Sequence, residues 1–297
     1  MNIIVTGSGG VLGKPIIQRL YREGHSIYGL DRIGGYRSKK IDIFDLSGMS
    51  DYFQSVKPQR VYHLASVVGR VNSESQAYHS VNVSVLGTVQ VAHLCLKRNA
   101  EMIFFSTSEI YGNVDLEKYS AIGLDQEDLP AEPINAYGTA KLMAEQYLLY
   151  LQRVYGLKLM IIRPFMIYGG EHDSRYRSVL SRFLWDLKEG RESRLDAGCH
   201  RSWCYVDDLT EGVKDFKEGI YNIGNSSELL SIEDLYRRSV RISGMTPRSK
   251  VSADPPNNIT VRSKNPNFAR AERKLGFKAK ISLNDGLRRE WSRINGT

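Results

Sequence analysis

The sequence predicts an α/β protein built on a doubly wound parallel sheet. Short apolar runs, typical of buried strands, recur in the first two-thirds of the 297-residue chain, near residues 2–6, 26–30, 60–64, 101–106 and 158–163. Between them, apolar side chains recur at helical spacing, in residues 11–22, 75–98 and 136–155. This βαβ alternation predicts parallel strands with helices on both faces of the sheet.

The pattern becomes less regular after residue 165, which indicates a second, smaller lobe. A helix is predicted at 178–189, and short strands are predicted at 201–206 and 220–223. We expect the chain to return to the sheet through the second of these strands. The first lobe is therefore predicted to span residues 1–165 plus about 201–224, and the second lobe about 166–200 and 225–297.

The composition is that of a globular protein, with 41% hydrophobic and 25% charged residues, and it argues against a disordered chain. No apolar run approaches the roughly 18 residues that a membrane-spanning helix needs. The first predicted strand is followed directly by glycines, and the N-terminal residues show neither the basic segment nor the cleavage site of an export signal. Three cysteines lack metal-site spacing. We therefore expect a cytoplasmic protein with no membrane partner and no metal.

The net charge of +8 is concentrated near the C-terminus. Residues 241–297 hold 13 Lys or Arg and 4 Asp or Glu, so their local excess is 13 − 4 = +9. A solvated basic face, a site for a substrate with a diphosphate, and a nucleic-acid surface all fit this pattern.

Three glycines, Gly7, Gly10 and Gly13, follow the first predicted strand and open the first predicted helix. This spacing allows a tight turn, close approach of the backbone to a pyrophosphate, and close helix–strand packing, with the helix N-terminus facing the phosphates. The turn therefore predicts a dinucleotide site, although an ordinary strand-to-helix turn has a similar composition.

Asp31 ends the second predicted strand, 31 − 13 = 18 residues after Gly13. A carboxylate at this position accepts hydrogen bonds from the adenosine ribose hydroxyls and repels a 2′-phosphate. It favours NAD over NADP. Arg32 and the basic cluster at 37–40 leave NADP as an alternative cofactor. Asp31 could also be an ordinary carboxylate at a strand end, with no role in cofactor binding.

Tyr137 and Lys141 lie four residues apart in a helical pattern, so their side chains leave the same face of the helix. An unperturbed phenol has a pKa of about 10 and is a poor base at neutral pH. A neighbouring ammonium lowers the pKa of a phenol. The pair predicts a general base that removes a hydroxyl proton.

Together these motifs resemble the extended short-chain dehydrogenase/reductase family, and more closely its NAD-dependent nucleotide-sugar epimerases and dehydratases. Further motifs in the family order extend this resemblance over nearly the whole chain: His63-Leu64-Ala65-Ser66, Ser106-Thr107-Ser108-Glu109-Ile110-Tyr111-Gly112, Arg163-Pro164-Phe165, Arg201-Ser202-Trp203-Cys204-Tyr205-Val206-Asp207-Asp208, Tyr221-Asn222-Ile223-Gly224 and Leu275-Gly276-Phe277. The resemblance implies a Rossmann-type NAD-binding domain and a smaller C-terminal α/β lobe that binds a nucleotide-diphosphate sugar.

The resemblance also assigns roles to residues. Thr107 is expected to hydrogen-bond the sugar 4-hydroxyl, Tyr137 to remove its proton as hydride leaves C4 for NAD, and Lys141 to bind the nicotinamide ribose. A later step returns the hydride. The implied cofactor contacts are Gly7, Gly10, Val11, Leu12, Gly13, Asp31, Arg32, Asp42, Ile43, Leu64, Ala65, Ser66, Asn82, Tyr137, Lys141 and Pro164.

The residue at position 109 bears on which reaction of the family this protein catalyses. Thr107-Ser108-Glu109 resembles sugar dehydratases and UDP-glucuronate decarboxylases, in which the glutamate assists chemistry beyond C4 oxidation. This makes a nucleotide-sugar 4,6-dehydratase the first hypothesis, a 4-epimerase the alternative, and a decarboxylase-like enzyme a further one; the protein is then a lyase or an isomerase. A structural role for Glu109 also stays open.

Substrate contacts are expected from Ser108, Arg201 and Arg262, since the resemblance places an arginine at Arg201 near the substrate's phosphates or carboxylate. Met166 stands where the family usually has an asparagine, and Gly170 replaces a frequent proline. The family often forms dimers through a helix pair, so a homodimer is expected. An RNA-binding or regulatory relative is the non-enzyme alternative, which the intact catalytic set disfavours.

Overall fold

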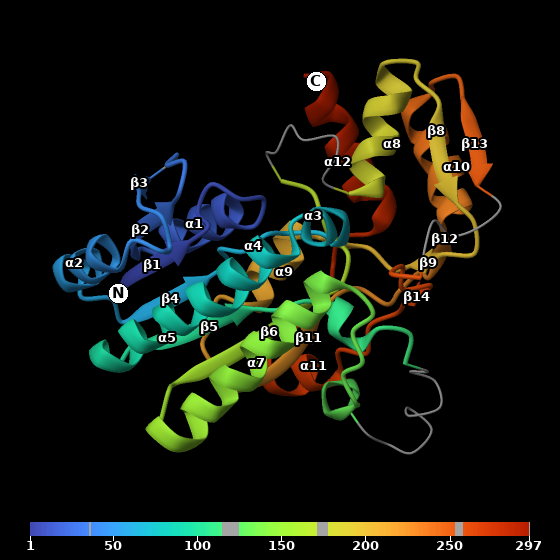
Figure 1. The fold of residues 1–297 in the computed structure, drawn as a ribbon. Helices are drawn as coiled ribbons and strands as arrows, with labels where there is room; N and C mark the ends of the chain where they lie inside the picture. Colours follow the sequence, from blue (N-terminus) through green and yellow to red (C-terminus); the bar gives the residue numbers. More distant parts are fainter. Residues whose placement is uncertain (36, 115–124, 171–177, 253–257, 297) are drawn as a thin grey trace.

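The computed structural model describes residues 1–35, 37–114, 125–170, 178–252 and 258–296. Its centre is a seven-stranded parallel sheet in the order β3-β2-β1-β4-β5-β6-β11 (Figure 1). The strands are β1 (Asn2–Thr6), β2 (Ser26–Asp31), β3 (Ser38–Lys40), β4 (Arg60–His63), β5 (Glu101–Phe105), β6 (Leu159–Pro164) and β11 (Gly219–Ile223). The strand order reverses between β1 and β4, which confirms the predicted doubly wound sheet.

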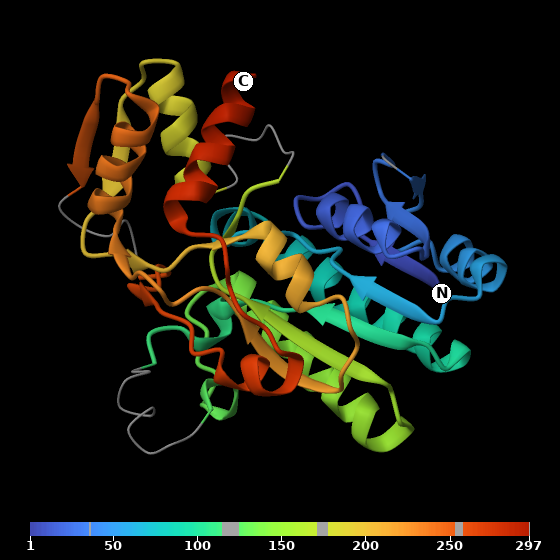
Figure 2. The same cartoon turned by 180° about the vertical axis from the view of Figure 1, so that it is seen from behind.

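Helices cover both faces of this sheet (Figures 1 and 2). One face carries α2 (Leu46–Val56), α5 (Gly87–Arg98) and α7 (Ala136–Tyr155), and the other carries α1 (Gly13–Arg22), α9 (Val206–Gly212) and α11 (Ala269–Leu275). The β1 sequence explains the two cores, because successive side chains of a strand point to opposite faces. Ile4 packs in the core under α2, α5 and α7, and Ile3 and Val5 pack in the other.

The helix predicted at 75–98 is divided, so this prediction was wrong in detail. The segment contains the end of α3 (Arg70–Ser75), then α4 (Ala77–Val81), a π-helical turn (Asn82–Leu86) and α5. Within it, Thr88 Oγ1 donates to Ser84 O (2.7 Å), and Ser66 Oγ hydrogen-bonds Ser84 Oγ (3.0 Å). A side-chain hydrogen bond to the backbone, such as the one from Thr88, competes with the regular helical ladder.

The smaller lobe packs beyond the carboxyl ends of the strands (Figure 1). Its main elements are α8 (Val179–Lys188), β8 (Ser193–Asp196), α10 (Ile232–Ser243), β13 (Ser249–Ser252) and α12 (Leu283–Asn295). Short strands join the two lobes: β7 (Ile167–Tyr168), β9 (His200–Arg201), β10 (Cys204–Tyr205), β12 (Leu230–Ser231) and β14 (Ser263–Lys264). The single strand expected at 201–206 is thus two strands, β9 and β10, which pair with different partners.

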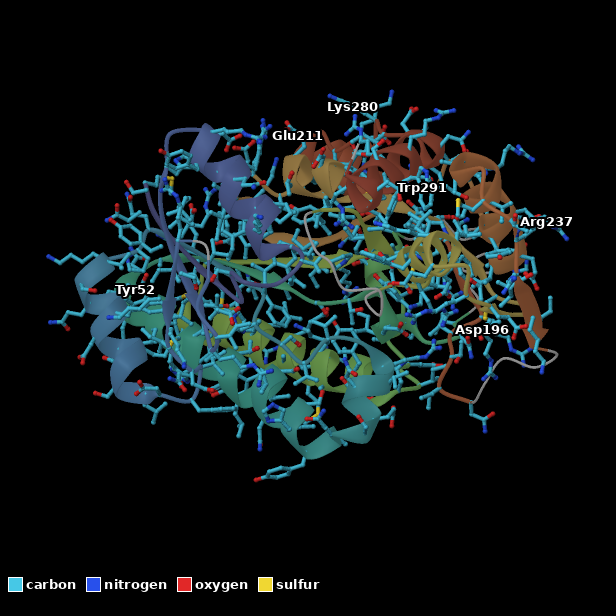
Figure 3. All side chains as sticks on the ribbon, turned by 90° about the horizontal axis from the view of Figure 1, so that it is seen from above. Tyr52, Asp196, Glu211, Arg237, Lys280 and Trp291 are labelled. Carbon is cyan, nitrogen blue, oxygen red and sulfur yellow. The ribbon has the colours of Figure 1, made fainter. Side chains whose placement is uncertain are left out.

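Many basic side chains of the C-terminal region are neutralised by ion pairs. Arg270 and Arg273 bind Asp125, and Arg293 binds Glu290. The labelled Arg237 and Lys280 in Figure 3 point outward from the lobe. The basic C-terminal region thus combines paired and solvated charges, and its role stays open between a solvated face, a diphosphate site and a nucleic-acid surface.

Helix α7 exposes an apolar stripe formed by Met143, Tyr147, Tyr150 and Val154. The homodimer expected through a helix pair stays a prediction, and this stripe is the surface that it would cover. Among the helices that the structure describes, none combines the length and apolar character needed to cross a membrane.

A buried ion pair holds α7 against the sheet. Arg163 at the end of β6 binds Glu145 of α7 through two hydrogen bonds of 2.7 and 3.1 Å, and both side chains are nearly inaccessible. Arg163 also donates to the Tyr111 hydroxyl (2.8 Å), which in turn donates to Asn222 Oδ1 (2.9 Å). These hydrogen bonds satisfy charges that would be costly to bury alone.

We predict that Glu145→Gln lowers the free energy of unfolding by about 3 kcal/mol, because it leaves the Arg163 guanidinium buried without a counter-charge. Urea unfolding followed by circular dichroism measures this change. Arg288→Ala, which removes a surface ion pair with Asp285, is the control and should have little effect. A Glu145→Gln protein as stable as this control would contradict the prediction.

Candidate functional site

A cavity of about 330 Å³ lies at the carboxyl ends of β1, β4, β5 and β6, where the strand order reverses. Ligands of doubly wound α/β proteins bind at this switch point. The predicted residues that line the cavity are Gly7, Gly10, Val11, Leu12, Gly13, Asp31, Leu64, Ala65, Ser66, Thr107, Ser108, Glu109, Tyr137, Lys141 and Pro164. These residues come from segments more than a hundred positions apart in the sequence; the lining of this cavity is called the wall below.

The glycine turn has the geometry of a dinucleotide cradle. Gly7 has a φ of +68°, and a Cβ there would lie 2.7 Å from the Ala65 nitrogen. A Cβ on Gly13 would lie 2.5 Å from the Gly7 oxygen. Only glycine fits at both positions, so the backbone reaches the cavity without side chains in the way.

Asp31 lies at the end of β2, beside this turn. Its Oδ2 accepts a hydrogen bond from the Gly9 backbone N–H (3.1 Å), and its Oδ1 accepts one from the Ile33 N–H (3.1 Å). The carboxylate is therefore fixed at the edge of the cavity. This position suits hydrogen bonds from ribose hydroxyls.

Four residues predicted to contact the cofactor lie outside the cavity wall. Arg32 is exposed next to Asp31, and Asp42 Oδ1 accepts from the Phe44 N–H (2.9 Å). Ile43 is buried and packs against Gly87, and Asn82 begins the π-helical turn. Their roles toward the cofactor stay predictions.

Thr107, Tyr137 and Lys141 come together in the same wall. Thr107 follows β5, and its Oγ1 accepts from the Glu109 N–H (3.2 Å), which caps the short helical turn at Ser108–Tyr111. Tyr137 and Lys141 lie one turn apart on α7 and are almost fully buried. The helix begins at Asn135, whose Oδ1 accepts from the Gly138 N–H (2.9 Å). This cap sets where the helix starts, and Tyr137 lies in its first turn.

The Lys141 ammonium is held in a largely apolar setting. Its Nζ donates to the Phe105 carbonyl (2.7 Å) and lies 4.7 Å from the centre of the Phe104 ring. Burial lowers the pKa of Lys141 to about 7, and Glu145 opposes this only in part. In its protonated form, Lys141 places a positive charge one helical turn from Tyr137, and this charge favours the phenolate of Tyr137.

His63, at the end of β4, is a structural residue. Its two ring nitrogens hydrogen-bond Thr6 Oγ1 (2.7 Å) and Thr88 Oγ1 (2.9 Å). Burial and the nearby Lys141 lower its pKa to about 3, so the ring is neutral at physiological pH. It joins β1, β4 and α5 below the cavity floor.

Glu109 is bound at both carboxylate oxygens. Oε1 forms an ion pair with Lys264 Nζ, and Oε2 accepts from Asn135 Nδ2 (2.9 Å). Burial alone would raise the pKa of this carboxyl, but Lys264 and Asn135 hold it below its usual range. Glu109 is therefore ionised, and its ion pair with Lys264 links it to the C-terminal part of the chain.

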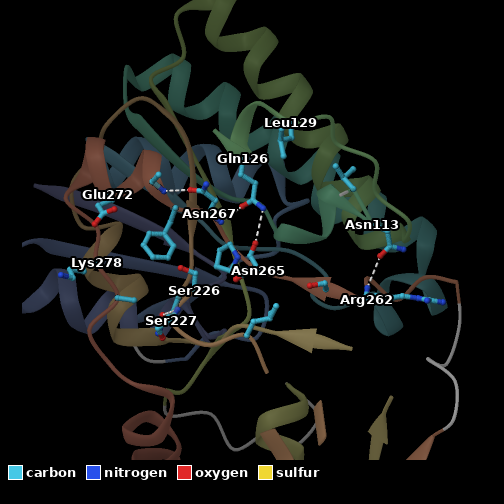
Figure 4. Close-up of a pocket in the computed structure, with 18 residues that line it drawn as sticks. Asn113, Gln126, Leu129, Ser226, Ser227, Arg262, Asn265, Asn267, Glu272 and Lys278 are labelled. Carbon is cyan, nitrogen blue, oxygen red and sulfur yellow. Dashed lines mark hydrogen bonds between the residues drawn. The ribbon is translucent and has the colours of Figure 1, made fainter. Parts of the chain in front are cut away.

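Arg201 and Arg262, both predicted to bind substrate, are not in this wall. Arg201 is buried, and its guanidinium donates to the backbone carbonyls of His200 (2.8 Å), Val261 (2.5 Å) and Arg262 (2.7 Å). Arg262 lines a second cavity of about 1100 Å³. In Figure 4 it lies beside Asn113 at one end of that cavity, with Glu272 and Lys278 at the other. The substrate roles of both arginines stay predictions.

Sequence reasoning did not single out Phe105, Ser106, Ile167 and Lys264 as residues of the wall, whereas it pointed to Met166 and to the stretch 67–72, which contains Val68 and Gly69 of the wall, as places near the substrate. Lys264 is 155 positions from Glu109, and no local pattern signals their pairing. Met166 has a φ of +42°, a left-handed conformation that asparagine adopts more readily than methionine. This conformation gives a physical reason for the asparagine expected at position 166.

The sequence profile of the NAD dependent epimerase/dehydratase family matches residues 3–224, and the chain belongs to this family. Its cofactor is NAD. The cavity fits this group, because the glycine cradle admits a pyrophosphate and the Asp31 carboxylate can accept hydrogen bonds from ribose hydroxyls.

Individual relatives are distant but full-length. The chain is 24% identical to the UDP-glucose 4-epimerase of Mycolicibacterium smegmatis, over 97% of this chain and 96% of the relative. The NAD complex of UDP-glucose 4-epimerase from Thermus thermophilus superposes with a TM-score of 0.90 at 24% identity, covering 100% and 99% of the two chains. UDP-glucuronic acid 4-epimerase from Bacillus cereus, with UDP-glucuronic acid and NAD, gives 0.85 at 25% identity, covering 100% and 99%.

We predict that the burial of Lys141 makes the cofactor-free protein more stable as the pH rises above about 7. In that range the unfolded chain binds a proton at Lys141 that the folded chain has lost, so the free energy of unfolding increases with pH. Lys141→Met removes this proton. The stability of wild type relative to this variant should rise between pH 7 and 9 with a slope approaching about 1.4 kcal/mol per pH unit, measured by urea unfolding. A difference independent of pH would contradict the prediction.

Proposed function

We propose that this protein oxidises C4 of a nucleotide-diphosphate sugar and then reduces the ketone from the opposite face, as a 4-epimerase. The convergence of Thr107, Tyr137 and Lys141 beside the glycine cradle carries this proposal. NAD, held by the glycine cradle and Asp31, would supply the acceptor and donor of the hydride that leaves and returns to C4. The solved structures that combine this fold with NAD include 4-epimerases by name, which supports the assignment.

The protein's own residues manage the proton and the orientation of the sugar. Thr107 Oγ1 hydrogen-bonds the 4-hydroxyl and presents it to Tyr137. The Tyr137 phenolate takes the hydroxyl proton, and Lys141 stabilises the phenolate by its positive charge. In the return step the Tyr137 hydroxyl gives the proton back to the oxygen at C4. Epimerisation requires only that the sugar ring present its other face between these steps.

The state of Glu109 favours epimerisation over 4,6-dehydration. Dehydration needs a base for the C5 proton and an acid for the leaving C6 hydroxyl. The carboxylates among the described residues of the wall are Asp31, at the ribose end, and Glu109. Glu109 has both oxygens bound and a lowered pKa, which makes it a weak base.

A 4,6-dehydratase remains the second candidate because Glu109 has a partner that could supply the acid. Lys264 is paired with Glu109, and its pKa is lowered by burial, which makes its proton easier to release. Glu109 as base and Lys264 as acid would together remove water from C5 and C6 of the 4-keto sugar.

We predict that Tyr137→Phe lowers kcat by at least about 100-fold, because the phenol is the group that accepts the hydroxyl proton. Bound NAD, measured by its release on denaturation, should stay near the wild-type amount. Tyr147→Phe, on the same helix but partly exposed, is the matched control and should keep its turnover. Wild-type turnover in Tyr137→Phe would disprove the assigned base.

The mass of the product decides the reaction. Purified protein is incubated with UDP-, GDP-, dTDP- and CDP-sugars, and products are separated by chromatography and weighed by mass spectrometry. We expect a new isomer of unchanged mass. Loss of about 18 Da would indicate dehydration instead, and loss of about 44 Da decarboxylation. Glu109→Gln should retain epimerisation, whereas a dehydratase would lose its activity with this substitution.

A further inference from the structure

Positive charge exceeds negative charge around Glu109. Lys264 pairs with Glu109, and Arg201 and Arg70 are close enough to lower the pKa of Lys264 further. Arg201 also acts electrostatically on Glu109, and Arg70 on Arg201. Lys264 and Arg201 thus both act on the Glu109 carboxylate, and Arg70 adds a third positive charge that acts on Lys264 and Arg201, in a region where water cannot screen them fully.

Lys264 is placed to meet a substrate. It enters the cavity from β14 of the smaller lobe and lines the same wall as Thr107 and Tyr137. Its side chain is almost fully buried, at 8% exposure. A buried ammonium needs negative partners, and the Glu109 carboxylate interacts with Arg201 as well as with Lys264.

The two arginines differ in how they are bound. Arg201 is committed to three backbone carbonyls, so it contributes charge from a fixed position. Arg70 begins α3, directly after Val68 and Gly69 of the cavity wall. Its buried Nε has no hydrogen-bond partner among the residues that the structure describes. This donor and the Lys264 ammonium leave unused capacity for an anion.

We propose that the substrate sugar is a hexuronate, and that its C6 carboxylate is bound by Lys264 with support from Arg70. This assignment rests on the proposed C4 oxidation, because it uses the orientation of the sugar at Tyr137. A carboxylate supplies the negative charge that Lys264, Arg201 and Arg70 lack, and its oxygens can accept hydrogen bonds from the unused donors of Lys264 and Arg70.

The position of Lys264 favours a sugar carboxylate over the diphosphate as this anion. Its partner Glu109 lies two residues after Thr107, the residue assigned to the 4-hydroxyl. In a hexopyranose C6 branches from C5, next to C4, whereas the diphosphate is attached to C1 at the far side of the ring. An ammonium near the C4 end is therefore close to C6.

Binding measurements on the full-length, NAD-loaded protein test this proposal. Isothermal titration calorimetry compares UDP, UDP-glucose and UDP-glucuronate as probes. Wild type should bind UDP-glucuronate at least about tenfold more tightly than UDP-glucose. Lys264→Gln should remove this preference and change the affinities for UDP and UDP-glucose by less than about threefold. Lys264→Arg should restore much of it, which separates loss of charge from misfolding.

Two further variants sharpen the reading. Glu109→Gln frees the Lys264 ammonium and should tighten binding of UDP-glucuronate. Lys250→Gln, an exposed lysine on β13, is the matched control and should bind all three probes as wild type does. Circular dichroism and NAD content verify that each variant is folded.

Several results would overturn the proposal. Equal affinities of wild type for UDP-glucose and UDP-glucuronate would remove its basis. A Lys264→Gln variant that loses affinity for UDP itself would show that the cluster serves the diphosphate. The proposed reaction fails independently: if the hexuronate preference holds but neither sugar is epimerised, the carboxylate site stands without that reaction. Epimerisation of UDP-glucose without a preference would instead leave the reaction standing and remove the carboxylate site.

Discussion

The site depends on the hydrogen bonds of one side chain, that of Asn135. Its Oδ1 caps α7, its Nδ2 binds Glu109 Oε2, and the same Nδ2 reaches the Ile259 carbonyl of the C-terminal region (3.3 Å). A helix cap, an active-site carboxylate and the smaller lobe are thus held by a single amide. The cap fixes where the helix that carries Tyr137 begins.

The sequence predicted those parts of the protein that depend on local spacing. The strands of the parallel sheet other than β3 come from short apolar runs, and the glycine turn and the Tyr137–Lys141 pair come from spacings of three and four residues. The strand order then brings these parts to one edge of the sheet. The break at Gln76, where φ is −136°, and the π-helical turn at Asn82–Leu86 were not foreseen, because the spacing of apolar residues does not distinguish these local geometries from a regular helix.

The sequence did not predict which charged residues far apart in the chain interact with one another. Nothing near Lys264 marks it as a partner of Glu109, and nothing near Arg201 shows that its guanidinium binds backbone carbonyls. A basic C-terminal region was visible as a count of charges. Which of those charges enter the cavity, and which are neutralised by Asp125 or Glu290, is decided only by tertiary packing.

The ion pair between Glu109 and Lys264 joins the two lobes, since the first follows β5 and the second belongs to β14. An anion that competes with Glu109 for Lys264 weakens a connection between the lobes at the moment it binds. The same ammonium would then serve both the proposed recognition of the sugar and one of the contacts between the lobes. The other contacts, such as the hydrogen bond from Asn135 to the Ile259 carbonyl, do not involve Lys264, so a substitution at position 264 leaves them in place.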